Sequence, residues 1–259
     1  MRFAKVDSLL VYVADSRAQM GQLSGQEAAA AIRLLLDVKE TINVMFAAAP
    51  SQDDVLSELC AAGDIDWSRV NAFYMDEYIG LARTAPQGFG NYLREHVFDR
   101  LPFRQVFYIN PEAADPEAEA RRYEELLLAY PMDVCILGVG ENGHMAFNDP
   151  AEARFDDPHL VKTVHLDERC RQQQVNDGCF ARIEEVPKTA ITVTIPGLLR
   201  ARSMFCVVPT VRKAEAVVRM LTGGITADCP ATALRRKSGA RLYLDPDAAS
   251  LVKQGEAGL

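Results

Sequence analysis

The residues with the clearest chemical potential lie in GVGENGHMAFNDP, Gly138 to Pro150, which follows the apolar run Val134 to Leu137. Such a run predicts a buried strand of a parallel sheet. Glycines after it, Gly140 among them, allow a sharp turn and a close approach of the backbone to a ligand. His144 and Asp149 place an imidazole and a carboxylate on the same turn, a pairing typical of acid–base catalysis. Because open α/β sheets bind ligands beyond the carboxyl ends of their strands, the segment predicts a functional site.

A second carboxylate motif lies upstream, in FYMDEYIGL at residues 73–81. The apolar run at 70–74 predicts another strand, and Asp76 and Glu77 follow it in a turn. An aspartate there can take a proton from carbon, provided that burial keeps the carboxylate basic enough. Single carboxylates also cap helices or face solvent, and a single histidine also serves structural roles. The two motifs together, each at the end of a strand, favour catalysis.

The elements that must position these motifs alternate between strand and helix. Strands are expected at 9–13, 42–47, 70–74, 106–109, 134–137, 190–194, 204–208 and 241–244, and helices at 25–39, 53–62, 91–101, 116–129 and 211–221. This order predicts an α/β fold of the Rossmann-like type, with an open, mostly parallel sheet and helices on both faces. We expect residues 1–259 to form one domain. Segment 151–185 is polar and fits a lid or an excursion from the sheet.

Composition narrows the classes of partner. The formal net charge of -8 argues against nucleic acid, although a local pocket can still be positive. The six cysteines show no CxxC pair and no zinc spacing, which favours a reduced, metal-free protein. No apolar run is long enough to span a membrane, and no signal peptide is evident, so we expect a cytoplasmic protein without membrane attachment.

The two motifs in this order resemble the glucosamine-6-phosphate deaminase (isomerase) family. The resemblance runs from about residue 42 to residue 244 and includes VPKTAITVT at 186–194 and Lys213 in VPTVRKAEA. The related 6-phosphogluconolactonases share the fold but typically show a DER-type turn and an SLFP-type ending, where this chain has DEY and AFNDP. The resemblance implies an enzyme without metal or organic cofactor, and a homo-oligomer is plausible. Its reaction would turn glucosamine 6-phosphate, or a related amino sugar, into fructose 6-phosphate and ammonia.

The resemblance also implies catalytic roles. Asp76 would remove the C2 proton and return it at C1, and His144 would assist opening of the pyranose ring. Asp149, a shorter carboxylate than the glutamate usual in the family, would orient His144 and support its charge. The family usually has an aspartate where this chain has Asn142, whose amide can only form hydrogen bonds. Gly140 is expected to contact the substrate.

The phosphate-binding part of the family pattern is altered in this chain. Typical members bind the sugar phosphate with a glycine-rich loop, and the matching stretch here is AAAPSQDD at 47–54. Its two aspartates would repel a phosphate, so Ser51 and Gln52 are the donors we expect it to use. Gln174 stands where the family places a phosphate-binding arginine. Lys213 is the phosphate ligand that the resemblance carries over most directly, although an ordinary surface lysine would also fit its position.

Two alternatives follow from the same residues. The first is a lactonase of the 6-phosphogluconolactonase type, in which His144 would activate water. The second is a sensor that binds a sugar phosphate without turnover, which Asn142 and the altered loop at 47–54 would suit. Release of ammonia, hydrolysis of a lactone, or ligand-induced stabilisation without turnover would distinguish the three functions.

Overall fold

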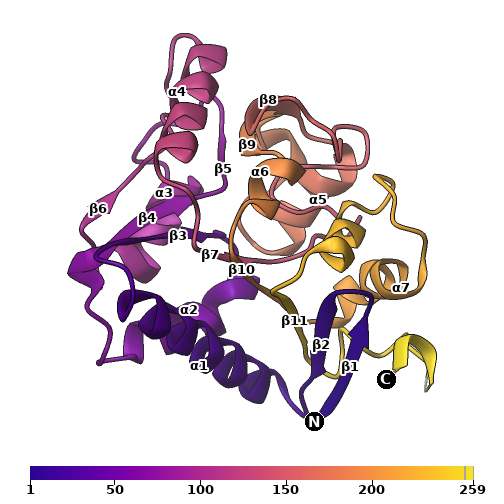
Figure 1. The fold of residues 1–259 in the computed structure, drawn as a ribbon. Helices are drawn as coiled ribbons and strands as arrows, with labels where there is room; N and C mark the ends of the chain where they lie inside the picture. Colours follow the sequence, from indigo (N-terminus) through magenta and orange to yellow (C-terminus); the bar gives the residue numbers. More distant parts are fainter. Residues whose placement is uncertain (254, 259) are drawn as a thin grey trace.

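The computed structural model describes residues 1–253 and 255–258 and is built around one open sheet (Figure 1). Its strands follow the order β1 (Arg2–Val6), β2 (Leu9–Val13), β11 (Ala240–Leu244), β10 (Ser203–Val208), β7 (Val134–Leu137), β3 (Ile42–Phe46), β4 (Val70–Tyr74) and β6 (Gln105–Val106). Among the described strands of this sheet, only the β1–β2 pair is antiparallel. The predicted α/β fold with a mostly parallel sheet is therefore confirmed.

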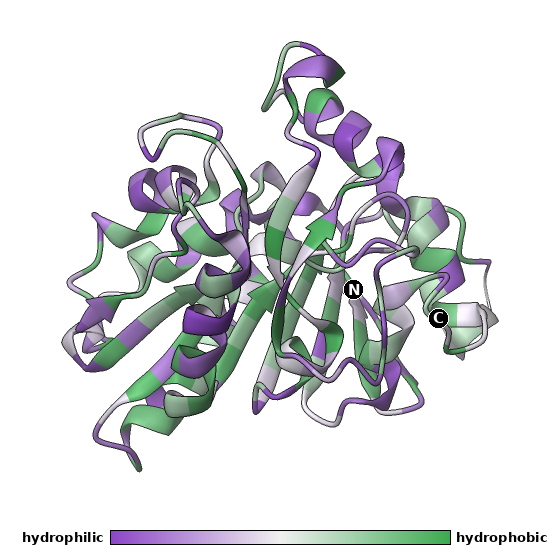
Figure 2. Cartoon of the chain, turned by 90° about the horizontal axis from the view of Figure 1, so that it is seen from above, coloured by the Kyte–Doolittle hydropathy of each residue, from purple (hydrophilic) through white to green (hydrophobic). Residues whose placement is uncertain are grey.

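Seven α-helices are described around this sheet. They are α1 (Arg17–Leu36), α2 (Asp53–Ala61), α3 (Phe89–Leu93), α4 (Pro116–Ala129), α5 (Glu168–Asn176), α6 (Ile195–Leu199) and α7 (Ala214–Thr222). Hydrophobic residues gather on the central strands, while the surrounding helices and loops carry most of the hydrophilic ones (Figure 2). Within the described ranges, each helix is too short or too polar to cross a membrane.

Two glycines of α1 let this long helix approach α2 closely. A Cβ atom at Gly21 would lie 2.5 Å from the Cβ of Asp54, and one at Gly25 would lie 2.2 Å from the Cβ of Glu58. The side chain of Ser16 caps the start of α1 by accepting a hydrogen bond from the main-chain N–H of Gln19. Since α1 also contacts β3, β7, β10 and β11, it covers one face of the sheet and holds α2 against its side.

A second, antiparallel sheet consists of β5 (Asp76–Tyr78), β9 (Thr189–Val193) and β8 (Val161–His165). The DEY segment is therefore a strand, and its expected assignment as a turn was wrong. Strand β9, which we placed in the main sheet, pairs instead with β5, so that Asp76 lies opposite Thr192. An apolar run shows that a strand is buried but not which neighbour it pairs with, and this is why the sequence missed the second sheet.

The main sheet brings four loops with predicted site residues together at the carboxyl ends of its central strands. Strands β10, β7, β3 and β4 are neighbours in that order, and the loops that follow their carboxyl ends carry the predicted site residues. The chain adds β3, β4 and β6 in one direction, and then returns to add β7, β10 and β11 in the other. The strand order therefore reverses at the boundary between β3 and β7. The loops after Phe46 and Leu137 therefore flank a topological switch point, where open α/β sheets bind ligands.

Candidate active site

A narrow cavity of about 60 Å³ lies at the switch point. Its wall is formed by the loop after β3, the start of β5, the loop after β7 and one side of α5. A hollow of about 290 Å³ shares Ala48, Ala49 and Phe89 with it, so the two adjoin. The cavity wall brings together five of the predicted site residues, which are Ser51, Gln52, Asp76, Gly140 and His144.

Asp76 presents an unpaired carboxylate to this cavity. Its side chain is 6% exposed, and it accepts no hydrogen bond and forms no ion pair with any described residue. Burial raises the pKa of Asp76 well above its ordinary value, and the neighbouring Glu77 charge adds to the rise. A buried carboxylate that is kept basic and has no protein partner is suited to accept a proton from a ligand.

Glu77, the next residue, serves the structure instead. Its carboxylate accepts main-chain hydrogen bonds from Tyr78 and Phe89, both at 3.0 Å, and from Gly90 at 2.8 Å. Burial raises the pKa of Glu77, although these hydrogen bonds work against the rise. Since successive residues of a strand point to opposite faces, Asp76 and Glu77 are separated by the pleat of β5.

The neighbouring carboxylates should therefore respond differently to truncation. We expect Glu77→Ala to lower the free energy of unfolding by about 2–4 kcal/mol, because it leaves three buried N–H donors without an acceptor. The matched variant Asp76→Ala removes no hydrogen bond and should not destabilise the protein. Urea unfolding of both variants measures the difference, and equal losses of stability would contradict these assignments.

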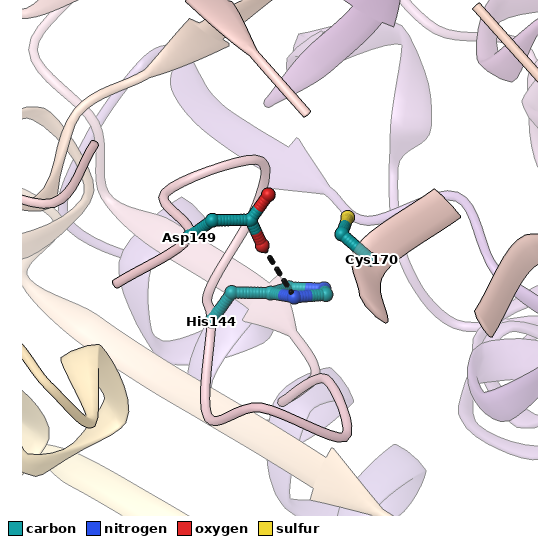
Figure 3. A group of neighbouring side chains, drawn as sticks. All are labelled: His144, Asp149 and Cys170. Atoms are coloured by element: carbon teal, nitrogen blue, oxygen red, sulfur yellow. Dashed lines mark ion pairs between the residues drawn. The ribbon is translucent and has the colours of Figure 1, made fainter. Parts of the chain in front are cut away.

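His144 is held by one side of its ring. Its Nδ1 lies 2.8 Å from Oδ1 of Asn142. The same nitrogen lies 3.1 Å from Oδ1 of Asp149 (Figure 3). Both neighbours are acceptors at this point, so Nδ1 carries the proton and points away from the cavity. Nε2 has no hydrogen bond with any described residue, and the ring lines the cavity wall. His144 can therefore exchange a proton with a ligand through Nε2.

Asp149 is the fixed charge behind this imidazole. It is fully buried and also accepts hydrogen bonds from Nδ2 of Asn142 at 2.9 Å and from the N–H of Asp167 at 3.1 Å. Burial alone would raise the pKa of Asp149, but the contact with His144 and these hydrogen bonds lower it below its ordinary value. The carboxylate therefore stays ionised and supports a positive charge on His144.

The same pair has a thiol beside it. Cys170, on α5, is 1% exposed, and ligand atoms of His144, Asp149 and Cys170 all lie within 4.8 Å of one another (Figure 3). Three such groups could in principle hold a metal ion. Burial and the Asp149 charge raise the pKa of Cys170 well above its ordinary value, so the thiol keeps its proton beside the pair.

The loop after β7 is shaped to fit the imidazole. A Cβ atom at Gly140 would lie 2.1 Å from Cε1 of His144, so only glycine leaves room for the ring. Ala146, two residues after the histidine, has a φ of 50°, in the left-handed region that a residue with a side chain rarely adopts. Backbone strain of this kind is concentrated at functional sites.

Ser51 and Gln52 are arranged differently from each other. The Gln52 amide is fully buried and donates to the carbonyl of Val207 and to Oγ of Ser51, both at 3.1 Å. Its donors are thus engaged within the protein, where they fix the loop to the end of β10. The Ser51 hydroxyl accepts from Gln52 and keeps its own proton for a ligand.

The acidic start of α2 is compensated by neighbouring groups. Asp53 accepts a hydrogen bond from the Tyr92 hydroxyl, and Asp54 pairs with Nε of Arg17 at 2.7 Å. These contacts reduce the repulsion of an anion that we expected from the two carboxylates.

Lys213 ends the short 3-10 turn Val211–Lys213, directly before α7, and is 4% exposed. It makes no hydrogen bond or ion pair with any described residue, and burial lowers its pKa. A buried ammonium without a partner is unfavourable unless an anion reaches it. Lys213 does not form part of the described wall of the 60 Å³ cavity, whereas Gln174 does.

Sequence reasoning missed what α5 contributes. Asp167 caps α5 by accepting from the N–H of Cys170, and its other oxygen accepts from Nδ2 of Asn142 at 3.0 Å. Gln173 accepts from the N–H of Glu141 at 2.9 Å and lines the cavity. An aspartate three residues before the N–H that it caps is a recognisable helix start, so Asp167 could have been found within the unassigned segment.

Comparison with known proteins agrees with this geometry. Residues 15–243 match the family model of glucosamine-6-phosphate isomerases and 6-phosphogluconolactonases. A glucosamine-6-phosphate deaminase of Exiguobacterium sibiricum is 38% identical over 188 residues, 73% of each chain. One of Bacillus cereus is 35% identical over 226 residues, which cover 87% of this chain and 84% of the relative.

Solved structures give the same result for the fold. A monomeric glucosamine-6-phosphate deaminase superposes with a TM-score of 0.85 at 29% identity, covering 93% of this chain and 99% of the other. The 6-phosphogluconolactonase of Thermotoga maritima shares the fold, with a TM-score of 0.74 at 17% identity over 92% of this chain and 99% of the other. The chain therefore belongs to the family of glucosamine-6-phosphate isomerases and 6-phosphogluconolactonases.

Proposed function

We propose that this protein is a glucosamine-6-phosphate deaminase, which forms fructose 6-phosphate and ammonia. The observation that carries the proposal is that the unpaired carboxylate of Asp76 and the free Nε2 of His144 face one cavity at the switch point. The similarity to deaminases at 35–40% identity supports the same reaction. We also propose that the described chain forms one domain, because its site combines segments between residues 47 and 174.

The first step would open the sugar ring. His144 takes the proton of the C1 hydroxyl at Nε2 and gives a proton to the ring oxygen, which yields the open-chain aldehyde. The adjacent Asp149 carboxylate, 3.1 Å from Nδ1, stabilises the imidazolium that forms between these transfers.

The second step would move a proton between adjacent carbons. Asp76 removes the C2 proton while the carbonyl oxygen at C1 takes up a proton from the ammonium group on C2, which gives an enolamine. The same carboxylic acid then protonates C1. The product carries an imine at C2, and addition of water followed by loss of ammonia leaves the ketose. One base over one face of the substrate suffices for both transfers, which agrees with the single unpaired carboxylate in the cavity wall.

Substrate binding would require some opening of the site. A cavity of about 60 Å³ is far below the 300–1,000 Å³ typical of ligand sites, so a sugar would have to fill the adjoining hollow of about 290 Å³ as well or displace one wall. The hydrogen bond between Gln173 and Glu141 joins α5 to the loop after β7, and we propose that it breaks when the sugar enters.

Product analysis distinguishes deaminase activity from the alternative, lactonase activity. Purified protein should release ammonia and fructose 6-phosphate in equal amounts from glucosamine 6-phosphate, and should not hydrolyse 6-phosphogluconolactone. Lactone hydrolysis without ammonia release would instead identify a lactonase in which His144 activates water. Binding of both compounds without turnover would favour the sensor.

Lys213 is proposed to bind the substrate phosphate. We expect Lys213→Ala to raise KM for glucosamine 6-phosphate by roughly 10- to 100-fold with a smaller change in kcat, since a hydrogen bond to a charged group contributes about 1.5–3 kcal/mol. Arg212→Ala is the matched control, because Arg212 is exposed and contacts the carbonyl of Asn176 and Asp177. A KM unchanged in Lys213→Ala would place the phosphate elsewhere.

The oligomeric state stays a prediction. The superposed deaminase is a monomer, and a homo-oligomer of this chain can be tested by its mass in solution.

A further inference from the structure

A larger cavity, of about 450 Å³, lies beside Glu77 and outside the proposed active site. Its wall includes Arg83, Arg94 and Arg122, together with Tyr108 and Asn110. A volume of this size is typical of sites that bind small molecules. The reaction proposed above leaves this cavity without a role.

Two of the three arginines carry charges that no described group neutralises. Nε of Arg83 donates to the side-chain oxygen of Asn110 at 3.0 Å, and Arg94 donates to the side-chain oxygen of Asn91 at 2.7 Å. Neither guanidinium forms an ion pair within the described ranges. Arg122 differs, because Glu119 binds it through two hydrogen bonds of 2.6 and 2.7 Å.

The acidic groups around the cavity form no ion pair with the guanidinium groups of Arg83 and Arg94 within the described ranges. The Glu77 carboxylate accepts three main-chain hydrogen bonds, as described above. Glu119 pairs with Arg122, and among the described residues Glu112 accepts a hydrogen bond only from the main-chain N–H of Arg83, at 3.3 Å. The guanidinium groups of Arg83 and Arg94 are therefore available to bind an anion in this cavity, even though the whole chain has a net charge of -8.

Other groups on the wall suit an organic ligand. The amide nitrogen of Asn110 donates no hydrogen bond to any described residue, and the ring of Tyr108 lies beneath Arg94, 5.6 Å from its central carbon. The N–H donors of a planar guanidinium group match the geometry of phosphate oxygens. Two guanidinium groups balance the double negative charge of a phosphate monoester.

We propose that this cavity binds a small molecule carrying a phosphate group, at a site distinct from that of the substrate. The Glu77 carboxylate connects the two regions, because it also holds the N–H of Phe89. The Phe89 ring lines the active-site cavity and stacks on Phe147 with 5.4 Å between ring centroids. A ligand in the larger cavity would thus contact the wall that separates it from the catalytic residues.

The test is a calorimetric titration with inorganic phosphate at constant ionic strength, in the absence of substrate. Lys213→Ala is used as the background, so that phosphate binding in the active site is weakened. We expect this variant to bind phosphate, and we expect the added changes Arg83→Gln and Arg94→Gln to weaken binding by roughly tenfold or more. Arg121→Gln, on the exposed surface of α4, is the control and should leave the affinity unchanged.

Two results would overturn the proposal. The first is absence of phosphate binding to folded Lys213→Ala protein, and the second is an affinity that the two arginine changes do not alter. Circular dichroism melting curves establish that each variant is folded. If the half-buried Arg94 cannot be replaced, the exposed Arg83→Gln alone provides the same comparison. Because the titration measures binding without turnover, its outcome is independent of the proposed deaminase activity.

Discussion

Replacing Asp76 with asparagine is expected to lower kcat on glucosamine 6-phosphate by roughly 10²- to 10⁴-fold, the range that a general base usually contributes. Substrate affinity should change little, because the Asp76 carboxylate makes no hydrogen bond that shapes the site. Exchange of the C2 proton with solvent, followed by NMR, measures the step that fails. Exchange that persists in Asp76→Asn would show that another group is the base, and loss of binding together with exchange would make Asp76 structural.

The same variant should be more stable than the natural chain at neutral pH. Burial raises the pKa of Asp76 above its unfolded value, so the folded protein keeps a proton that the unfolded chain has already lost. Stability from this group is therefore highest at low pH and falls as the pH rises from the ordinary aspartate range through the raised pKa. Asp76→Asn removes this loss and should raise Tm at pH 7. An unchanged Tm would indicate that the carboxylate is less desolvated than its position suggests.

Activity of the natural chain should show the complementary dependence on pH. The base must be ionised, so kcat/KM should fall on the acidic side through a pKa above the ordinary aspartate range. The Asp76→Glu variant keeps a carboxylate and should retain this acidic limb at reduced activity. A limb at the ordinary value would contradict the assignment.

Replacing His144 with glutamine is expected to have the second largest effect, a decrease in kcat of roughly 10²- to 10⁴-fold. Glutamine can still hydrogen-bond to Asp149 but cannot transfer a proton, so ring opening would depend on the spontaneous reaction. C2 proton exchange from the small open-chain fraction should survive. The observable result is a rate limited by ring opening, measured by ammonia release. The exposed His159→Gln is the matched control.

A double variant tests whether His144 and Asp149 act as one unit. Asp149→Asn should lower kcat on its own, because it removes the negative charge 3.1 Å from Nδ1. Groups that act together are strongly non-additive, so Asp149→Asn combined with His144→Gln should be no slower than His144→Gln alone. Additive losses would show that Asp149 acts through another group.

Much of the fold could be predicted because local sequence determines local structure strongly. The predicted bounds of β4, β7 and α4 agree with the structure at both ends. Pro116 at the start of α4 and the capping Asp115 explain the precision there. The expected helix at 91–101 instead begins with α3 and continues as a π-helical turn, Arg94–Phe98. Hydrophobic spacing cannot distinguish these two helix types.

The sequence predicts those parts of the candidate site whose residues lie close together along the chain. His144 and Asp149 lie in one loop, so the sequence suffices to pair them. The support from Asp167 and Cys170 reaches them across the chain from α5, through contacts that only the folded arrangement reveals. The burial of Lys213 could not be predicted either, because a lysine at the start of a helix is usually exposed.

The most direct test of the central claim is one NMR experiment in D₂O with glucosamine 6-phosphate and the natural protein. We expect fructose 6-phosphate and ammonia in equal amounts from the natural protein, and both products roughly 10²- to 10⁴-fold more slowly with Asp76→Asn. C1 of the product should carry deuterium to the extent that the proton on Asp76 exchanges with solvent before it is returned. Folded natural protein that binds the sugar phosphate but yields no ammonia would contradict the account.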